Sequence, residues 1–538
     1  MGHLRGIMYD AKVWLKFLTS RSAARAAAIG LAWFAFVWAA VRAWVQALTG
    51  DEAQNYMFYA GMVHPSHWEW DNAAANHMLN SMGAVLFTSL LGLSAFSVRI
   101  PTLIGAAIYI YTIYRLCQML SQEWKIRIPL FVCLVYNPFI FDFFVAARGY
   151  GIGSAFLMGA IAVAAAWHLN YKHLVGGSRE LTTATAISSA FVTLAFTANF
   201  SMAFVGFTAM LGILVWAMKA EPARRWQLLA AGVIPALLVV LAIPSWALVH
   251  ARTGGIVAGV KSLKETLNSL VYASMFQPNP YLINPLLMPV FEILRKWVLP
   301  VTGALALIQF GWIVRDRVWR RSRQEGPDRN AHTAWLCALG SLVGSVAVLA
   351  VLEHRLAYRL FRLLMPVSRT GLYFLPLVTL MVGIAAAIPA LSRGAAVCRK
   401  ALIAALCVVG VYYLSCMRLM YFEEWNYQAD LNQAYKTVAC YNHEKNIQDV
   451  EVSWEYHAGM NFQRLASGRE TFGPFGGTTP HTTGHEMYIL EENFERDFIQ
   501  AQGLKVVFKG DMTAMVVAVR ADLADGPGQG CYVWPAYP

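Results

Sequence analysis

Residues 50–80 read GDEAQNYMFYAGMVHPSHWEWDNAAANHMLN. This stretch starts where a hydrophobic run, Leu31 to Leu48, ends, and it gathers carboxylates and imidazoles among aromatic rings. A carboxylate at the low-dielectric edge of a bilayer can acquire the pKa that a general base needs, and aromatic rings favour that boundary. The stretch therefore predicts an active-site loop at the end of a first membrane span.

The composition places the chain among polytopic membrane proteins. Hydrophobic residues make up 57% and charged residues 14% of the 538 residues, whereas soluble proteins carry about 25% charged residues. The net charge of +12 fits cytoplasmic loops and lipid head groups, so we predict membrane lipids and no nucleic acid as partners. Basic residues precede the first apolar run without a small-residue cleavage site, which predicts a retained span and not a removed signal peptide.

Crossing about 30 Å of hydrocarbon takes about 20 apolar residues. The basic connectors fall on one side of the membrane if the N-terminus is cytoplasmic and residues 76–93 do not span. We therefore predict that residues 76–93 form a helix in the outer interface; an ordinary span with one connector miscounted is the alternative. About eleven spans are predicted, at residues 27–48, 100–120, 128–146, 151–169, 182–199, 201–218, 227–250, 297–314, 333–352, 372–391 and 401–420.

An odd number of spans places the C-terminal segment outside the cytoplasm. Polarity rises from Tyr421 onward, and a segment of this size can bury its own small core. The predicted fold is an all-α membrane domain over residues 1–420, with its first exterior loop at 51–99, followed by an α/β domain over residues 421–538. A helix is predicted at residues 430–443, and strands at 450–454, 505–508 and 512–520.

Two of the eight cysteines, Cys440 and Cys531, fall in this exterior segment. They either form one disulfide or stay unpaired, because sequence spacing does not give the distance between their Cα atoms. The other six lie in or beside hydrophobic spans and are predicted to be core thiols. Four histidines of the exterior segment are predicted to be surface residues: His443, His457, His481 and His485.

Four short motifs carry a family resemblance through their order relative to the spans. The motifs are Gly50-Asp51-Glu52-x-x-x-Tyr56, Asn76-His77-x-Leu79, Ser97-Val98-Arg99-Ile100-Pro101 and Ala147-Arg148-Gly149-Tyr150. Together they resemble the integral-membrane GT-C glycosyltransferases, in the bacterial branch around protein O-mannosyltransferases and the lipid A aminoarabinose transferase. The likeness covers residues 27–170 by motif and the later spans by architecture.

The resemblance implies a transferase of the bacterial inner membrane. Such an enzyme takes a sugar from a polyprenyl-phosphate carrier and places it on a lipid, glycan or protein acceptor outside the cytoplasm. The family's acidic residue after the first helix, which acts as base or lies at the reaction centre, corresponds to Asp51. The chain departs from the family in lacking a proline pair at the start of the interfacial helix, at Asn76 to Leu79.

The chemistry of such a transfer requires a carboxylate to activate the acceptor hydroxyl and cations to stabilise the departing phosphate. Asp51 is the predicted base; alternatively it caps the next helix, with Gln54 at the return position of a capping box. Glu52 is the second candidate for this catalytic carboxylate. Asp142, at the exterior end of the third span, is a further candidate, or else a helix-end residue that reaches toward water. The predicted sugar-binding or acceptor-binding residues are Tyr56, Trp68, Trp70 and His77.

Arginines on the side predicted to be exterior are candidates for holding the donor phosphate. Arg355, Arg359 and Arg362 would project from one face of a helix, since they are spaced four and then three residues apart. Guanidinium groups grip phosphate through paired hydrogen bonds, and Arg148 is predicted to join them. The alternative is a face that pairs with lipid head groups.

Zinc-binding residue types recur in the loop, at His64, His67, Glu69 and His77. Their spacing matches no helical two-histidine motif, so we predict no metal ligands and leave a divalent metal open as cofactor. The chain has no Walker loop, Rossmann glycine fingerprint or paired Cys-x-x-Cys motif, which argues against ATP, a dinucleotide and structural zinc. Two rival functions stay open: a polymerase or ligase of lipid-linked glycans, and a transporter.

Overall fold

The computed structural model describes residues 21–61, 76–170, 178–250, 259–275, 287–319, 327–390, 392–468, 472–477 and 481–525. Its contacts divide the chain into two compact units. Unit 1 comprises Met1–Trp38, Ile104–Phe144 and Gly149–Met417. Unit 2 comprises Ala39–Leu103, Val145–Arg148 and Arg418–Pro538. Two long helices, α2 (Arg21–Val45) and α5 (Ala95–Leu120), contribute residues to both units.

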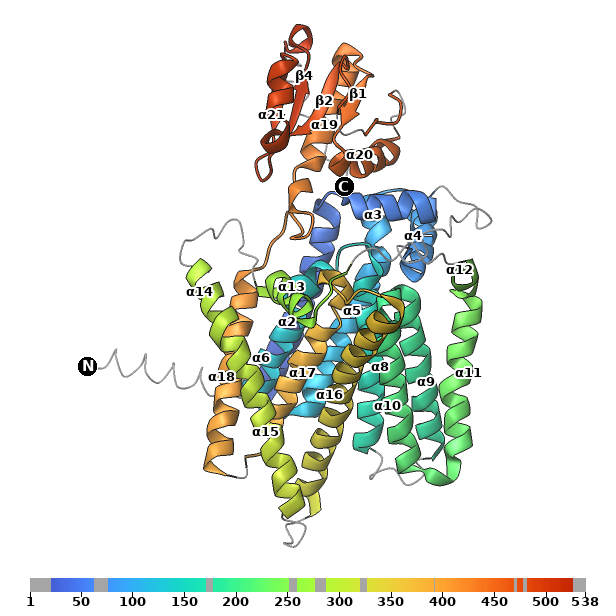
Figure 1. Cartoon of the computed structure of the whole chain (residues 1–538), viewed down its shortest axis with the longest axis vertical. Helices are drawn as coiled ribbons and strands as arrows, with labels where there is room; N and C mark the ends of the chain where they lie inside the picture. The colour runs from blue at the N-terminus through green and yellow to red at the C-terminus, as the bar shows by residue number, and fades with distance from the viewer. Residues whose placement is uncertain are drawn as a thin grey trace, which may run out of the picture. The chain divides into compact units, whose positions relative to one another are not determined.

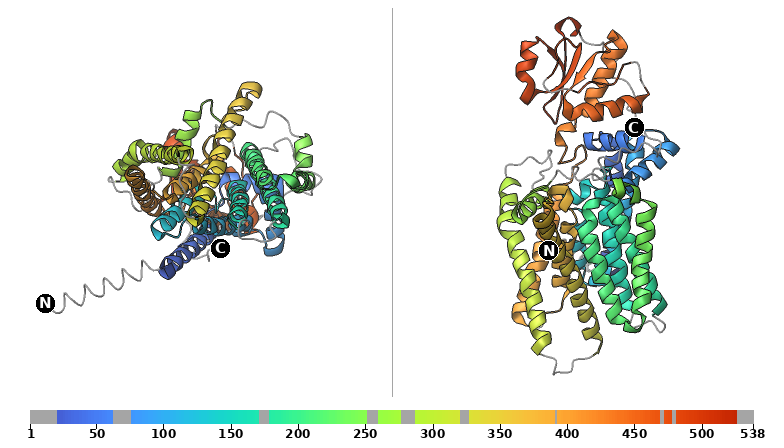
Figure 2. Two further views of the ribbon diagram at one scale, coloured as in Figure 1. Left: turned by 90° about the horizontal axis from the view of Figure 1, so that it is seen from below. Right: turned by 45° about the vertical axis from the view of Figure 1, so that its right-hand side comes forward.

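Unit 1 is a bundle of helices (Figure 1). Helices α8, α9, α10 and α11 pack side by side (Figure 2). The elements of unit 1 after α5 are α6 (Trp124–Val135), α7 (Pro138–Asp142), α8 (Gly149–Asn170), α9 (Ser178–Ala198), η4 (Phe200–Met202), α10 (Ala203–Ala220), η5 (Pro222–Arg224), α11 (Arg225–Ala242), α12 (Ser245–His250), α13 (Leu263–Met275), α14 (Leu287–Ile293), η8 (Leu294–Val298), α15 (Leu299–Trp319), α16 (Pro327–Phe361), η9 (Ser368–Gly371), α17 (Phe374–Ala387) and α18 (Arg393–Ser415).

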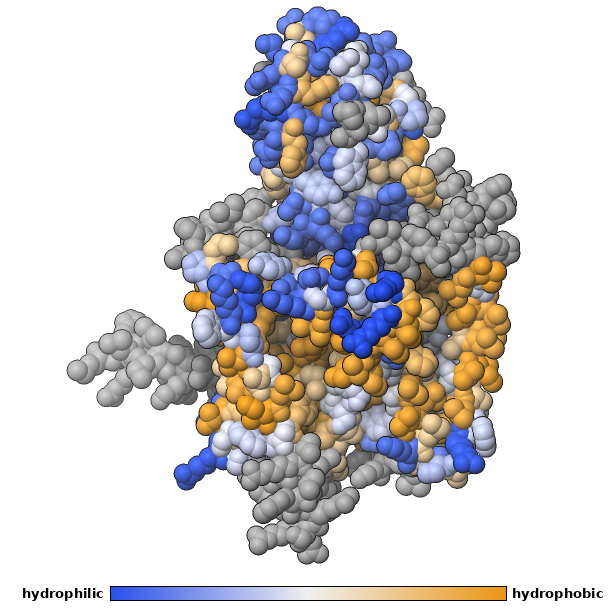
Figure 3. Space-filling model, viewed as in Figure 1, coloured by the Kyte–Doolittle hydropathy of each residue, from blue (hydrophilic) through white to orange (hydrophobic). Residues whose placement is uncertain are grey.

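Eight helices in the described part of the chain are long and apolar enough to cross a membrane. Hydrophobic side chains cover the helices of unit 1 in the view of Figure 3. The large exposed ones include Trp226 on α11, Leu307 on α15 and Val411 on α18. A water-soluble protein rarely exposes so much contiguous apolar surface, so the chain is a multi-pass membrane protein.

The predicted span at residues 128–146 is wrong as a single helix. Helix α6 ends at Val135, and α7 begins at Pro138 after Asn137, whose side chain accepts hydrogen bonds from the N–H groups of Phe139 and Ile140. Proline disfavours helical geometry in the residue before it and itself suits the first position of a helix. The predicted span at 372–391 is also shorter than expected, since α17 has 14 residues.

Unit 2 joins the first predicted exterior loop to the C-terminal segment. The loop forms α3 (Gly50–Asn55), the π-helix η1 (Tyr56–Gly61) and α4 (Met78–Leu91). At 14 residues, α4 is shorter than the about 20 residues of a span. The C-terminal segment forms η10 (Asn426–Gln428), α19 (Leu431–Lys445), β1 (Val450–Val452), α20 (Trp454–Ser467), β2 (Met487–Glu491), α21 (Glu492–Ala501), β3 (Lys505–Lys509), β4 (Met515–Val519) and η11 (Ala521–Leu523).

The strands form one sheet in the order β1-β2-β4-β3, parallel between β1 and β2 and antiparallel elsewhere. Alternate residues face opposite sides of a strand. Ile489 and Val517 therefore pack with α19 and α20 on one face, whereas Leu490 and Val516 pack with Ile499 of α21 on the other. The prediction of a small α/β fold after an all-α membrane core is confirmed.

Some details of this segment differ from the sequence-based expectation. Trp454 begins α20 and does not extend the first strand, and β2, α20 and α21 were not predicted. Cys440 is disulfide-bonded, whereas Cys531 lies outside the described residues, so their pairing stays a prediction. Of the six predicted core thiols, all are free, and Cys407 alone is exposed among them.

Candidate active site

Helix α3, which carries Asp51, begins with a capping box. The Thr49 hydroxyl accepts a hydrogen bond from the Glu52 N–H (3.2 Å), and the Glu52 carboxylate accepts one from the Thr49 N–H (2.9 Å). The alternative interpretation, that Asp51 caps this helix with Gln54 at the return position, is therefore wrong. Asp51 is the second residue of the helix, and its side chain is not needed to start it.

Glu52 is fully buried and makes four hydrogen bonds through its two carboxylate oxygens. Arg99 donates to both oxygens, from Nε to Oε1 (2.9 Å) and from Nη2 to Oε2 (2.7 Å). The Ala147 N–H also donates to Oε1 (2.6 Å), and the Thr49 N–H completes the set at Oε2. A carboxylate engaged in this way holds α3, α5 and the segment Val145–Arg148 together, and it is poorly placed to take a proton from a substrate.

Arg99 also joins the end of α2 to α3. It donates to the carbonyl oxygen of Ala43 in the last turn of α2 (3.3 Å) and to those of Gln46 (2.8 Å) and Ala47 (2.7 Å), which follow the helix. Carbonyl groups at the end of a helix have no partners within the helix, and a cation satisfies them well. Arg99 lies in one of the motifs quoted above, but sequence reasoning gave it no role. The signal was an arginine at the start of an apolar helix, which is rarely retained without a partner.

Asp51 differs from Glu52 in its exposure. Its side chain is 30% exposed, and its Oδ2 lies 3.9 Å from Nη2 of Arg148. Arg148 also donates through Nη1 to the backbone oxygen of Asp51 (2.9 Å). Among the described residues, Nε of Arg148 has no hydrogen-bond partner although it is buried. A partly exposed carboxylate therefore lies beside a guanidinium that retains donor capacity.

Buried amide and hydroxyl side chains hold α4 beside this pair. Asn80 donates to the Ala147 carbonyl (2.8 Å) and accepts from the Thr102 hydroxyl (3.0 Å). Asn55 at the end of α3 donates to the Ser81 hydroxyl (3.2 Å). These contacts connect α3, α4 and α5 around the backbone that precedes Arg148.

The predicted sugar-binding and acceptor-binding residues have different environments. The Tyr56 ring is buried and packs edge-on against Phe462 at a centroid distance of 5.9 Å, and its hydroxyl donates to Thr88 (3.2 Å). His77 is buried at the start of α4. Trp68 and Trp70 lie outside the described residues, as do His64, His67 and Glu69.

The remaining predicted site residues belong to unit 1. Asp142 is buried at the last position of α7. Arg355 and Arg359 are exposed on α16. The predicted common helix face is wrong for Arg362, because α16 ends at Phe361 and Arg362 takes a left-handed φ of 59°. Only the first two of these arginines project from the same helix.

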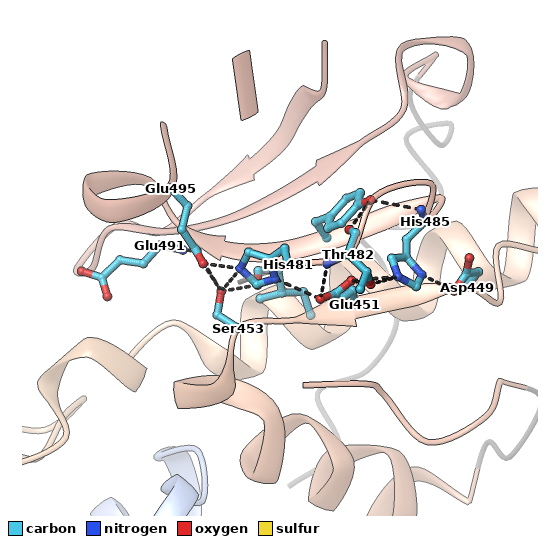
Figure 4. Close-up of polar contacts among 10 residues, drawn as sticks. Asp449, Glu451, Ser453, His481, Thr482, His485, Glu491 and Glu495 are labelled. Carbon is cyan, nitrogen blue, oxygen red and sulfur yellow. Dashed lines mark hydrogen bonds and ion pairs between the residues drawn. The ribbon is translucent and has the colours of Figure 1, made fainter. Parts of the chain in front are cut away.

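The prediction that His481 is a surface residue is wrong. Its side chain is 4% exposed and lies between the carboxylates of Glu451 (3.1 Å) and Glu495 (Figure 4). His485 bridges Asp449 (2.7 Å) and Glu451 (2.8 Å) in the same row. Among the described residues, no group of three or more histidine, cysteine or acidic side chains is arranged to hold a metal ion.

Acidic groups continue toward the start of α20. Glu491 lies at the end of β2, and its backbone N–H donates to Glu495 (2.6 Å). Burial, and then the neighbouring carboxylates of Glu455 and Glu495, raise the pKa of the Glu491 side chain. This part of the C-terminal segment is therefore crowded with carboxylates, three of which contact the imidazole rings of His481 and His485.

Comparisons with known proteins give structural matches alone. No family model and no curated protein matches the sequence. The chain is similar to the crystal structure of ArnT from Cupriavidus metallidurans bound to undecaprenyl phosphate, with 12% identity over 93% of this chain and 98% of that one and a TM-score of 0.39. It is also similar to the oligosaccharyltransferase of Archaeoglobus fulgidus, solved with zinc and sulfate, with 12% identity over 80% of this chain and 61% of that one and a TM-score of 0.38.

Proposed function

We propose that this chain is a membrane glycosyltransferase that moves a sugar from a polyprenyl-phosphate carrier to an acceptor outside the cytoplasm. The observation that carries the proposal is the contrast between two neighbouring acids: Glu52 is buried in four hydrogen bonds, whereas Asp51 is partly exposed beside Arg148. The first acid is committed to holding the backbone together, and the second keeps part of its side chain exposed beside a guanidinium group. An acid and a guanidinium in this arrangement suit a reaction that needs a base and a leaving anion.

In the proposed reaction, Asp51 accepts the proton of an acceptor hydroxyl as its oxygen attacks the anomeric carbon of the sugar. The bond between that carbon and the phosphate oxygen breaks, and the electron pair leaves with the polyprenyl phosphate. Arg148 steadies Asp51 through its backbone oxygen and can donate a further hydrogen bond to the growing negative charge of the phosphate. No step requires an oxidant or a nucleotide.

A direct assay tests this function. Purified protein in lipid nanodiscs is incubated with polyprenyl-phosphate hexoses or pentoses and with lipid, glycan or protein acceptors from a bacterial envelope. Mass spectrometry should detect an acceptor heavier by one sugar residue, together with free polyprenyl phosphate. Release of polyprenyl phosphate without a glycosylated acceptor would indicate hydrolysis, and absence of both products with all donors would contradict the proposal.

The donor phosphate is proposed to bind Arg355 and Arg359, the arginines in the last turns of α16. Replacing Arg355 or Arg359 by alanine should weaken polyprenyl-phosphate binding by about 1.5–3 kcal/mol, the contribution of a hydrogen bond to a charged group. Lysine at either position should restore only part of the affinity, because it keeps the positive charge but lacks the planar guanidinium group that donates two parallel hydrogen bonds. Titration of the variants with polyprenyl phosphate measures the effect.

The matched control is Arg393→Ala, which removes an exposed arginine from another long helix, α18. Unchanged affinity in the Arg355 and Arg359 variants would leave Arg148 as the proposed phosphate ligand.

The orientation in the membrane is proposed from the charge of the connectors, with the N-terminus cytoplasmic and the C-terminal segment outside. A reporter pair fused after Pro538 measures it: alkaline phosphatase should be active and green fluorescent protein dark. The same pair fused after Lys219, in the last turn of α10, should give the opposite result. Cytoplasmic activity after Pro538 would place Asp51 on the wrong side for this function.

A further inference from the structure

The N–H group of the first residue of α3 donates a hydrogen bond to a side chain that is distant in the sequence. The Gly50 N–H donates to Oε1 of Gln428 at 2.7 Å, across 378 residues. Gln428 is the last residue of η10 and is 4% exposed. The first four N–H groups of a helix have no partner within the helix, so a buried one must find another acceptor. Gln428 supplies that acceptor one residue before Asp51.

The same side-chain amide also bonds the first turn of a second helix. Nε2 of Gln428 donates to the carbonyl oxygen of Glu455 in α20 at 2.5 Å. An amide carries an acceptor and a donor in one rigid plane, so a single side chain fixes the distance between the two backbones that it bridges. Gln428 therefore ties the start of α3 to the start of α20.

The backbone at Gly50 and at Gly459 packs closely against these groups. A Cβ atom on Gly50 would lie 3.0 Å from Nε2 of Gln428 and 3.4 Å from the Glu455 oxygen. A Cβ atom on Gly459, one turn along α20, would lie 3.3 Å from the carbonyl oxygen of Leu48. Glycine at both positions lets the backbone of α20 approach the chain that leads into α3.

The start of α20 is itself anchored to the sheet. Ser453 precedes α20, and its N–H and hydroxyl both donate to the Ile489 carbonyl oxygen of β2 (2.9 and 3.1 Å). Its hydroxyl also lies 2.8 Å from the Glu495 carboxylate, in the row of polar contacts with His481 (Figure 4). The Glu455 carbonyl, two residues after Ser453, is therefore held in place relative to the sheet. Because Gln428 bonds both Glu455 and Gly50, it fixes the position of Gly50 relative to the sheet as well.

Asp51 thus lies between two residues that are each held by hydrogen bonds to distant parts of unit 2. Gly50 is bonded by Gln428, and Glu52 is bonded by Arg99 and the Ala147 N–H. We propose that Gln428 is a positioning residue for Asp51, through which the C-terminal segment orients the proposed base. This inference rests on the proposed glycosyltransferase function. A displacement of about 1 Å at a catalytic group can cost about 10²-fold in rate, so a remote amide can matter greatly.

The test compares Gln428→Met with Gln463→Met. Gln463 also makes a partly buried hydrogen bond within unit 2, in which its side-chain amide donates to Asn432 at 2.7 Å. This hydrogen bond does not involve α3. In the transfer assay, Gln428→Met should lower kcat by about 10²-fold, with the KM for the lipid-linked sugar changed by less than about three-fold. Gln463→Met should keep the wild-type kcat. Gln428→Glu keeps the acceptor for Gly50 but loses the donor for Glu455, so its kcat should fall between those of wild type and Gln428→Met.

A second readout does not depend on activity. Hydrogen exchange followed by mass spectrometry should show faster exchange in peptides covering residues 50–55 for Gln428→Met and unchanged exchange for Gln463→Met. Unchanged exchange in the Gln428 variant, or an equal loss of kcat in both variants, would overturn the positioning role. If the wild type transfers no sugar, the proposed function fails, while the exchange experiment still decides whether Gln428 orders α3.

Discussion

Asp51→Asn should lower the turnover of sugar transfer by about 10²–10⁴-fold, the range that general base catalysis supplies. The amide has the size of the carboxylate but does not accept a proton from the acceptor hydroxyl. Thr49 caps α3, and Arg148 bonds the backbone oxygen of Asp51, so neither structural contact depends on the lost charge. Thermal unfolding and polyprenyl-phosphate affinity should therefore stay close to wild type, and initial rates at saturating donor measure the effect.

The control for this prediction is Asp522→Asn. Asp522 also pairs with an arginine, Arg520, at 2.8 Å, but both side chains are exposed in the C-terminal segment. Its loss should leave turnover unchanged. Transfer by Asp51→Asn within a few-fold of wild type would contradict the assignment of Asp51 as base.

Arg99→Met should destabilise unit 2 by about 3–5 kcal/mol, the cost of leaving one partner of a buried ion pair alone. The Glu52 carboxylate would keep the N–H groups of Thr49 and Ala147 but lose both bonds from Arg99. The carbonyl groups at the end of α2 would lose their donor as well. Thermal unfolding in detergent, with the yield of monodisperse protein, measures the loss.

Two variants decide whether this loss comes from the unpaired charge. Arg520→Met removes an exposed arginine from the pair with Asp522 and should leave thermal unfolding close to wild type. Arg99→Met combined with Glu52→Leu removes both buried charges and should be more stable than Arg99→Met alone. If Glu52→Leu lowers the stability of the Arg99→Met variant as much as it lowers that of the wild type, the two residues do not act as a pair.

Hydropathy and charge determined the class of this protein without any tertiary information. Runs of apolar residues have to be buried in lipid or protein, so long ones predict membrane helices wherever they occur. The same reasoning identified the polar loop from Gly50 and the small α/β segment after Tyr421. It missed the break before Pro138, because the apolar run continues through it although the backbone does not stay helical.

The division of roles between Asp51 and Glu52 was decided by tertiary structure alone. The two acids are adjacent in sequence and have nearly the same chemistry, so composition and spacing do not separate them. The Glu52 carboxylate accepts hydrogen bonds from Arg99, 47 residues away, and from the Ala147 N–H, 95 residues away. The Gly50 N–H donates to Gln428, 378 residues away. Hydropathy reports how a residue partitions between water and lipid, a local property, whereas hydrogen bonds between distant residues depend on which segments the folded chain brings within about 3 Å. The sequence by itself therefore determined that an acidic loop follows a membrane helix, and only the folded chain decided which acid is buried among hydrogen bonds and which one stays partly exposed.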